Sequence, residues 1–293
     1  MDYGINEIDY KITQQLEMKK IVTTTLLLTC FITFSQQKTI GQKVDALLKR
    51  MTLEEKIGQL NQYTGDNAAT GPITINPNKQ SEIKTGLIGS MLNVLGTQHT
   101  RQYQELAMQS RLKIPLLFGQ DVIHGYKTIF PIPLGLAASW DMELVEKTSK
   151  IAANESYSRC INWTFAPMVD IARDARWGRI AESPGEDPLL ASRLGVAYVK
   201  GFQGADPSVP GQILACVKHF AAYGAAEGGR DYNTVSMSES LLRNVYLKPF
   251  EAAAKSGVAS FMTSFNDLNG VPASGNSFLV QPLYPMPLLC PYG

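Results

Sequence analysis

Short apolar runs alternate with longer amphipathic stretches along most of the chain. The apolar runs predict buried strands over residues 86–94, 114–119, 163–169, 213–220 and 258–265. The stretches between them predict helices over 98–112, 141–157, 189–202 and 238–255. A further helix is expected to begin at Thr52, because Thr52 and Glu55 have the spacing of a capping box. This alternation indicates βα units around a parallel sheet, and so an α/β fold.

Polar residues gather where the predicted strands end. They are Asp121, the stretch 173–187, Lys218–His219 and Asn266–Asp267. In a β/α barrel, the loops that follow the carboxyl ends of the strands form the binding and catalytic site. A doubly wound sheet has the same rhythm. However, no Gly-x-Gly-x-x-Gly fingerprint follows the first strand, and the number of polar loops favours a barrel.

Composition narrows the function classes. The 293 residues are 44% hydrophobic and 18% charged, as in an ordinary globular protein, and a barrel of roughly 250 residues would fit. The net charge of +1 gives no reason to expect nucleic acid or an anionic membrane as a partner. None of the three histidines has metal-ligand spacing, so no metal site is expected.

The N-terminal region predicts a targeting segment. A basic start at Met18 precedes residues 21–34, which are apolar apart from threonines and one cysteine. This is the layout of a secretory signal peptide. The apolar run is shorter than the roughly 20 residues that a transmembrane helix needs. We expect an upstream extension over 1–17, a signal peptide over 18–36, and a periplasmic or secreted protein without a stable membrane anchor. A buried N-terminal helix is the alternative.

Two polar groups have both a binding and a structural interpretation. Asp121 could accept two hydrogen bonds from sugar hydroxyls, or it could cap a helix or turn. The stretch 173–179 holds three arginines and Trp177. These side chains could bind substrate hydroxyls and offer a ring face to a sugar. They could equally form an ion-pair network with the acidic residues of 182–187 and pack in the core.

Lys218 and His219 are neighbours near the end of a predicted strand. Side chains of neighbouring strand residues point to opposite faces, so both reach one ligand only if the strand ends or kinks there. The structural alternatives are a solvated lysine and a packed, hydrogen-bonded histidine. A lysine at a strand end can also form a Schiff base, so a lyase that uses Lys218 is an alternative function.

Taken together and in chain order, these residues resemble glycoside hydrolase family 3, whose best-known members are exo-acting β-glucosidases. The matching runs are Met51–Leu60, Gly119–Tyr126, Phe130–Leu134, Phe165–Asp170, Arg173–Arg179, Glu182–Pro188, Lys218–Phe220 and Asn266–Gly270. The ordered set is far more specific than any single run. Within the family, the chain is most similar to the periplasmic β-glucosidases of Gram-negative bacteria.

The resemblance implies a TIM-like barrel followed by an α/β sandwich domain, a retaining mechanism and no cofactor. It implies that Asp121 binds hydroxyls of the sugar that is cleaved. It also implies that Arg179, Lys218 and His219 hydrogen-bond the same sugar, with Arg230 joining from the next loop. The implied substrate is a glucoside or a β-linked oligosaccharide with a terminal β-D-glucosyl residue.

Three positions depart from common family patterns and bear on specificity. Phe265 stands where many members have tyrosine, so one hydroxyl contact is expected to be missing. The loop Ala221–Gly224 differs from the Gly-His-Gly loop of the branch that cleaves N-acetylglucosaminides, which argues against that specificity. Lys127 lies near a position where some members use arginine.

The C-terminal residues depart further. In this family the nucleophile is an aspartate in a Val-Ser-Asp-Trp-like segment, one βα step beyond Asn266–Gly270. Here the likeness stops after Leu279, and residues 281–293 hold four prolines and no acidic residue. The resemblance therefore implies that the nucleophilic aspartate and the acid/base glutamate are both absent.

From these departures we expect an incomplete TIM-like (β/α) barrel over 37–280, with about six strands and its C-terminal strands missing, and an aberrant proline-rich tail over 281–293. We expect no catalytic residue, and hence no hydrolysis by the chain alone. A non-catalytic sugar-binding relative is the second interpretation, because the hydroxyl-binding residues are present.

Overall fold

The computed structural model describes residues 10, 12–20, 39–65 and 76–280. Contacts divide the chain into two compact units, with the boundary after Met51. The first unit contains α2 (Ile40–Leu48). This helix begins with a capping box formed by Thr39 and Gln42. Within the described ranges, no helix is both long and apolar enough to cross a membrane. Most of the predicted signal peptide and all of the predicted tail over 281–293 lie outside the described residues.

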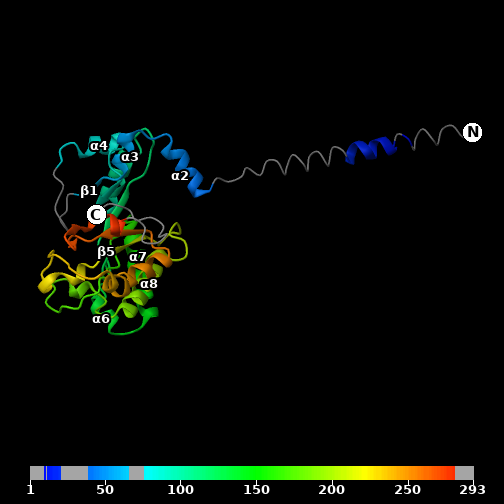
Figure 1. Ribbon diagram of the computed structural model, residues 1–293. Helices are drawn as coiled ribbons and strands as arrows, with labels where there is room; N and C mark the ends of the chain where they lie inside the picture. The colour runs from blue at the N-terminus through cyan, green and yellow to red at the C-terminus, as the bar shows by residue number, and fades with distance from the viewer. Residues whose placement is uncertain (1–9, 11, 21–38, 66–75, 281–293) are drawn as a thin grey trace, which may run out of the picture. The chain divides into compact units, whose positions relative to one another are not determined.

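The second unit is built on a sheet of six parallel strands that follow one another in chain order (Figure 1). The strands are β1 (Gln62–Thr64), β2 (Ser90–Leu92), β3 (Leu117–Gln120), β4 (Trp163–Thr164), β5 (Leu214–Phe220) and β6 (Ser260–Thr263). Every strand pairs in parallel with the next. A doubly wound sheet would reverse its strand order at a switch point. The uninterrupted order therefore confirms the prediction of an unclosed, TIM-like barrel with six strands.

Helices lie before, between and after the strands in chain order, largely as the periodicity predicts. They are α3 (Leu53–Gln59), α4 (Lys79–Thr85), α5 (Thr97–Ala107), α6 (Pro133–Ala137), α7 (Met142–Tyr157), α8 (Pro188–Gln203) and α11 (Ser277–Val280). The predicted capping box of Thr52 and Glu55 begins α3, with both reciprocal hydrogen bonds present. Asp141 caps α7 and Asp187 caps α8. Side-chain caps therefore set the starts of the two longest helices that cover the sheet.

Several predicted elements are shorter than expected, and two of them lie near a proline. The helix predicted over 238–255 is divided into α9 (Glu239–Leu241), a π turn over Leu242–Tyr246, and α10 (Lys248–Lys255). Pro249 lies in the first turn of α10, where its missing N–H breaks no helical hydrogen bond. The strand predicted over 163–169 ends at Thr164, because Pro167 cannot donate to a ladder.

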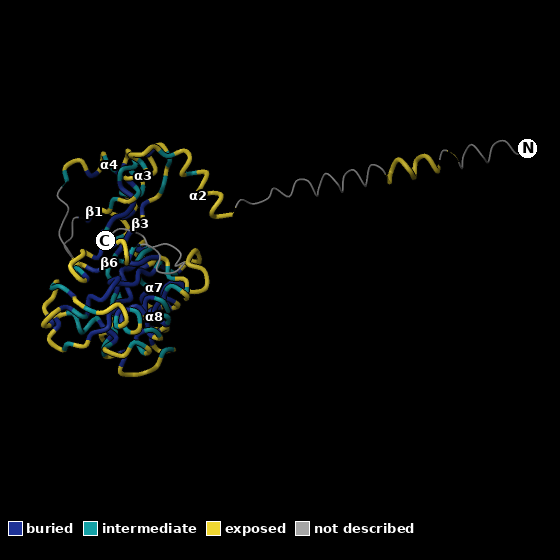
Figure 2. The backbone as a smooth tube through the Cα atoms, viewed as in Figure 1, coloured by how far each residue is buried: buried dark blue, intermediate teal, exposed yellow. Residues whose placement is uncertain are grey.

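The core lies between the sheet and the helices that cover it (Figure 2). Buried residues run along the strands and along the inner faces of α7 and α8, whereas the outer helix faces are exposed. The largest buried cluster includes Val145 of α7, Phe202 of α8, Val217 of β5 and Phe250 of α10. This packing holds the carboxyl ends of the strands in fixed relative positions.

Candidate binding site

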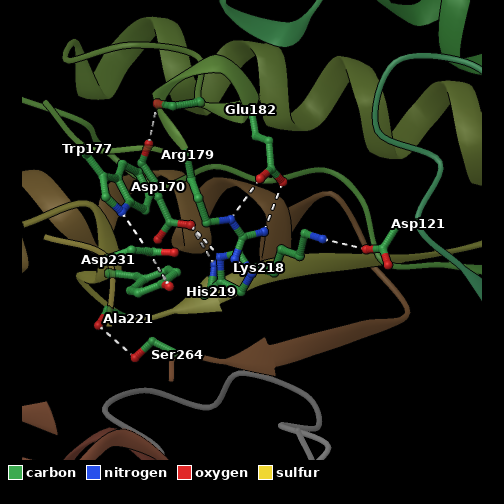
Figure 3. A network of polar contacts seen from close by, with 12 residues as sticks. Asp121, Asp170, Trp177, Arg179, Glu182, Lys218, His219, Ala221, Asp231 and Ser264 are labelled. Atoms are coloured by element: carbon green, nitrogen blue, oxygen red, sulfur yellow. Dashed lines mark hydrogen bonds and ion pairs between the residues drawn. The ribbon is translucent and has the colours of Figure 1, made fainter. Parts of the chain in front are cut away.

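Four of the five predicted site residues lie together at the carboxyl ends of the strands (Figure 3). Asp121 follows β3, Lys218 and His219 lie near the end of β5, and Arg179 lies in the loop before α8. Oδ1 of Asp121 is 2.7 Å from Nζ of Lys218. Nη1 of Arg179 is 3.3 Å from Nε2 of His219. Parallel strands end at a common edge, so residues that are 97 positions apart in the sequence meet there.

Arg230 is the fifth predicted residue. It is exposed and follows the 3₁₀ turn Glu227–Gly229. Among the described residues, its guanidinium makes no hydrogen bond or ion pair with the other four. Its predicted role in the site therefore stays a prediction.

A local irregularity in β5 explains how two consecutive residues enter one cluster. Lys218 pairs with Met262 of β6, whereas Phe220 pairs with the very next residue, Thr263. The register therefore shifts around His219, as at a β-bulge, and the regular alternation of faces is interrupted. The side chains of Lys218 and His219 are only 3% and 1% exposed. The interruption of the strand that would let both side chains enter one cluster is therefore present.

Arg179 is held by a carboxylate from its own turn. Its Nε and Nη2 donate to the two carboxylate oxygens of Glu182, at 2.7 and 3.0 Å. Burial opposes ionisation of Glu182, but the hydrogen bonds and charge of Arg179 lower the pKa of this carboxyl nonetheless. A bidentate pair fixes the plane of the guanidinium and directs Nη1 toward His219.

Asp170 belongs to the site, although the sequence did not single it out. Its Oδ2 accepts hydrogen bonds from the backbone N–H of His219 at 3.0 Å and from Nδ1 of His219 at 2.8 Å. Burial lowers the pKa of His219, although Asp170 opposes this effect. We assign a neutral ring with the proton on Nδ1, because Nε2 must accept from Arg179. Asp170 directly follows the strand predicted over 163–169, six residues beyond the end of β4, and this place after a predicted strand was the signal that could have identified it.

Buried aromatic residues pack against the cluster. Tyr223 is fully buried; its ring centroid is 5.1 Å from that of His219 and 5.6 Å from Cζ of Arg179. Asp231 accepts hydrogen bonds from the hydroxyl of Tyr223 at 2.5 Å and from Nε1 of Trp177 at 3.0 Å. Trp177 is only 1% exposed, so it packs in the core and offers no ring face to a ligand.

The three arginines of the stretch 173–179 have different surroundings. Arg176 forms an exposed ion pair with Asp174 at 2.6 Å, and Arg173 lies over the ring of Tyr246. Arg179 alone extends into the cluster with Lys218 and His219. In the described part of the chain, no group of three or more His, Cys, Asp or Glu side chains could hold a metal ion.

The arrangement is suited to a neutral, polyhydroxylated ligand. Asp121 and Arg179 keep partly exposed side chains, at 19% and 20%, beside the buried Lys218 and His219. Carboxylate acceptors and cationic donors alternate within a few ångströms, so adjacent hydroxyl groups can donate to one and accept from the next.

Residues 52–284 match the family described as "Glycosyl hydrolase family 3 N terminal domain". A periplasmic beta-glucosidase of Salmonella typhimurium is 44% identical over 239 residues, which are 81% of this chain and 31% of that protein. A beta-xylosidase of Formosa agariphila is 33% identical over 278 residues, 90% of this chain and 34% of that protein. The chain therefore spans about a third of the length of these relatives.

Solved structures give the same result. A beta-glucosidase from Listeria innocua has been solved with glucose and, as a mutant, with laminaribiose. Both structures superpose with a TM-score of 0.75 at 42% sequence identity, over 82% of this chain and 35% of that one.

Proposed function

Since this chain belongs to glycoside hydrolase family 3, we propose that it forms the sugar-binding part of an exo-acting, retaining β-glucosidase site. One observation carries the proposal. Asp121, Arg179, Lys218 and His219, drawn from three separate segments, form one contiguous polar cluster at the carboxyl edge of the sheet. We assign these four residues to the hydroxyl groups of the terminal β-D-glucosyl residue. The glucose and laminaribiose bound by the Listeria enzyme support this choice of sugar.

We assign no catalytic residue among those described. A retaining glycosidase needs a nucleophilic carboxylate and a second carboxyl group that donates a proton, about 5–5.5 Å apart. Each carboxylate at the site instead has a fixed partner. The pairs are Asp121 with Lys218, Asp170 with His219, Glu182 with Arg179 and Asp231 with Tyr223. Such pairing suits binding and positioning, so we attribute the covalent step to carboxyl groups other than these.

Calorimetric titration of the 293-residue chain with glucose tests the proposal. We expect one glucose per chain, weaker binding of the epimer galactose, and loss of glucose binding in Asp121→Ala. A folded chain that binds no glucose contradicts the assignment. We also expect no hydrolysis of an aryl β-glucoside by this chain, and measured turnover would contradict our view of the carboxylates.

The geometry disfavours a Schiff-base lyase. Nζ of Lys218 is bound to Asp121 at 2.7 Å, and its side chain is 3% exposed, so it is poorly placed to attack a carbonyl group. A non-catalytic sugar-binding protein remains the second candidate, favoured by the same hydroxyl-binding cluster. Glucose binding without turnover in a chain extended to the full length of its relatives would support it.

We also propose export to the periplasm or beyond. The signal peptide predicted from Met18 supports this location, as does the name of the periplasmic relative. Fusion of residues 18–40 to alkaline phosphatase, which is active only after export, should give phosphatase activity. Changing Lys19 and Lys20 to glutamate should reduce that activity, and an inactive parent fusion contradicts the proposal.

A further inference from the structure

An open pocket of about 710 Å³ lies between α5 and the end of α7. This volume is within the usual range of small-molecule sites. One wall follows α5 and the turn after it, from Thr100 to Gln109. At 1.5 Å per residue, that wall is about 14 Å long. Tyr157 and Cys160 line the other side, and Phe118 of β3 contributes from the sheet. The pocket therefore suits an elongated ligand.

The pocket is separate from the polar cluster of the proposed glucose site. Phe118 is the second residue of β3, and Asn162 directly precedes β4, so the pocket lies near the amino ends of these strands. Asp121 and Lys218 lie near the carboxyl ends of β3 and β5. The residues that line the pocket include none of the four cluster residues. A ligand bound here would therefore not compete with a sugar in the cluster.

Most of the pocket surface is apolar. The side chains that supply this surface are Met108, Phe118, Tyr157 and Ile161. Two of them remain in contact with solvent, since Met108 is 43% exposed and Tyr157 is 45% exposed. Removing such surface from water is favourable, and the flexible side chain of Met108 can adjust to the contour of a ligand. An unbranched alkyl chain that lies along α5 would contact these groups one after another.

Two carboxamide side chains supply the pocket with hydrogen-bond donors. Oε1 of Gln104 accepts from the backbone N–H of Leu116 at 3.0 Å. Oδ1 of Asn162 accepts from the backbone N–H of Phe118 at 2.8 Å. These bonds determine which end of each amide is the oxygen. Within the described part of the chain, neither amide nitrogen donates to another residue. Both side chains line the pocket, so their NH₂ groups are available to an acceptor there.

Two charged side chains of α5 also line the pocket. Arg101 and Glu105 are exposed, and neither forms an ion pair with any residue that the structure describes. Arg101 lies three residues before Gln104, so the two side chains are neighbours on the helix surface. A cationic ligand would meet three donor groups and one carboxylate. An anion fits better, because it can accept from both amides and is attracted by Arg101, with Glu105 alone opposing it.

We propose that this pocket binds the anion of a medium-chain fatty acid. Its carboxylate accepts hydrogen bonds from the amide groups of Gln104 and Asn162, and Arg101 supplies positive charge beside them. Its alkyl chain lies along α5 against Met108 and Tyr157. This inference concerns a second site and does not depend on the proposed function. A fatty alcohol has the same chain without the charge, and a short carboxylate has the charge without the chain.

Calorimetric titration of the 293-residue chain with octanoate, octan-1-ol and acetate tests the proposal. We expect octanoate to bind about tenfold more tightly than octan-1-ol, because hydrogen bonds to a charged acceptor are strong, and acetate not to bind measurably. Asn162→Asp keeps the oxygen that accepts from Phe118 and replaces the donor with a second acceptor. It should weaken octanoate binding about tenfold and leave octan-1-ol binding within about twofold.

Further variants separate the donors from the overall charge. Gln104→Glu makes the same exchange on α5 and should have the same effect as Asn162→Asp. Gln102→Glu adds the same charge at an exposed position of α5 outside the pocket, and as the matched control it should leave octanoate binding within about twofold. Glu105→Gln removes the opposing charge and should strengthen octanoate binding about threefold.

Cys160 gives an independent measurement of where octanoate binds, because this exposed thiol lines the pocket. Saturating octanoate should slow the alkylation of Cys160 by iodoacetamide severalfold, as followed by peptide mass spectrometry. Glucose at the same concentration should leave the rate unchanged. Protection by octanoate alone would support the pocket as its site.

The other outcomes overturn the proposal. Octan-1-ol that binds as tightly as octanoate would show that the carboxylate is not recognised. Parent-like octanoate affinity in Asn162→Asp and Gln104→Glu would show that the amides do not bind it; where one of these variants unfolds, the other decides. An equal loss in Gln102→Glu would reflect overall charge. An unchanged alkylation rate of Cys160 at saturating octanoate would place the ligand elsewhere.

Discussion

The carboxylate of Asp170 and the imidazole of His219 form a buried pair, with Oδ2 2.8 Å from Nδ1. Their side chains are 0% and 1% exposed. Because Asp170 accepts a hydrogen bond from Nδ1 of His219, it holds the proton on that nitrogen. Nε2 is therefore left as the acceptor, in a fixed direction. The arrangement of the polar cluster therefore depends on Asp170 as well as on the residues that we propose to bind the sugar.

Stability should depend on pH through His219. Burial lowers the pKa of this imidazole in the folded chain, with Lys218 and Arg179 acting in the same direction and Asp170 against it. As the pH falls through the unfolded value of about 6.5, the unfolded chain takes up the proton first, so stability is lost. The melting temperature should fall between pH 7.5 and 5.5, and less steeply in His219→Asn. His99→Asn, at an exposed histidine, is the control. Equal slopes for the parent and His219→Asn would refute this origin.

Glu182→Gln should weaken glucose binding about tenfold. The substitution replaces a bidentate ion pair to Arg179 with a single neutral acceptor, so the guanidinium loses its fixed plane. Glu186→Gln removes an equal charge from an exposed position of the same loop and should leave the affinity within twofold. Calorimetry on both variants distinguishes lost orientation from a general change of charge. Equal effects of the two substitutions would disprove the orienting role.

Asp121→Ala should lower the free energy of unfolding by about 2 kcal/mol, besides abolishing glucose binding. The ammonium of Lys218, with a side chain 3% exposed, would lose a carboxylate partner at 2.7 Å. Asp121→Asn should cost less, because an amide oxygen can still accept. Urea unfolding measures both variants, with Asp45→Ala on the exposed face of α2 as control. Parent-like stability of Asp121→Ala would show that the pair adds nothing to folding.

Gly224→Ala should destabilise the chain by about 2 kcal/mol or more. A Cβ at Gly224 would lie 2.3 Å from the carbonyl oxygen of Ile171 and 3.2 Å from the ring of Trp177. Gly178→Ala is the matched substitution, since a Cβ there has nothing within 4 Å. Thermal unfolding should separate the two clearly. Similar melting temperatures would mean that the backbone around Gly224 adapts easily.

The sequence predicted the βα rhythm and the capping box of Thr52 and Glu55 because both depend on local chemistry. It missed β1, because Gln62–Thr64 contains no apolar run, and it missed the hairpin of β7 (Asp267–Leu268) and β8 (Val271–Pro272), whose strands have two residues each. Such short elements are stabilised by their partners rather than by their own side-chain pattern. A three-residue strand next to β2 is therefore visible only after the sheet has formed.

In the site too, the sequence predicted features that depend on local pattern and missed contacts between residues far apart in the chain. The convergence of Asp121, Lys218 and His219 followed from their places after predicted strands. The pairing of Asp170 with His219 spans 49 positions, and no local pattern records it. Likewise, whether Trp177 faced a ligand or the core depended on Asp231, which lies 54 positions away and receives its N–H.

Arg179 and Glu182 lie three residues apart in one turn, so the group that orients the guanidinium travels with it. The geometry of the pair therefore depends on residues of this turn alone. Substitutions in distant helices can move this loop as a whole. The orientation of the Arg179 guanidinium relative to the Glu182 carboxylate would stay the same. Moved into another barrel of the same type, residues 179–182 should carry their geometry with them.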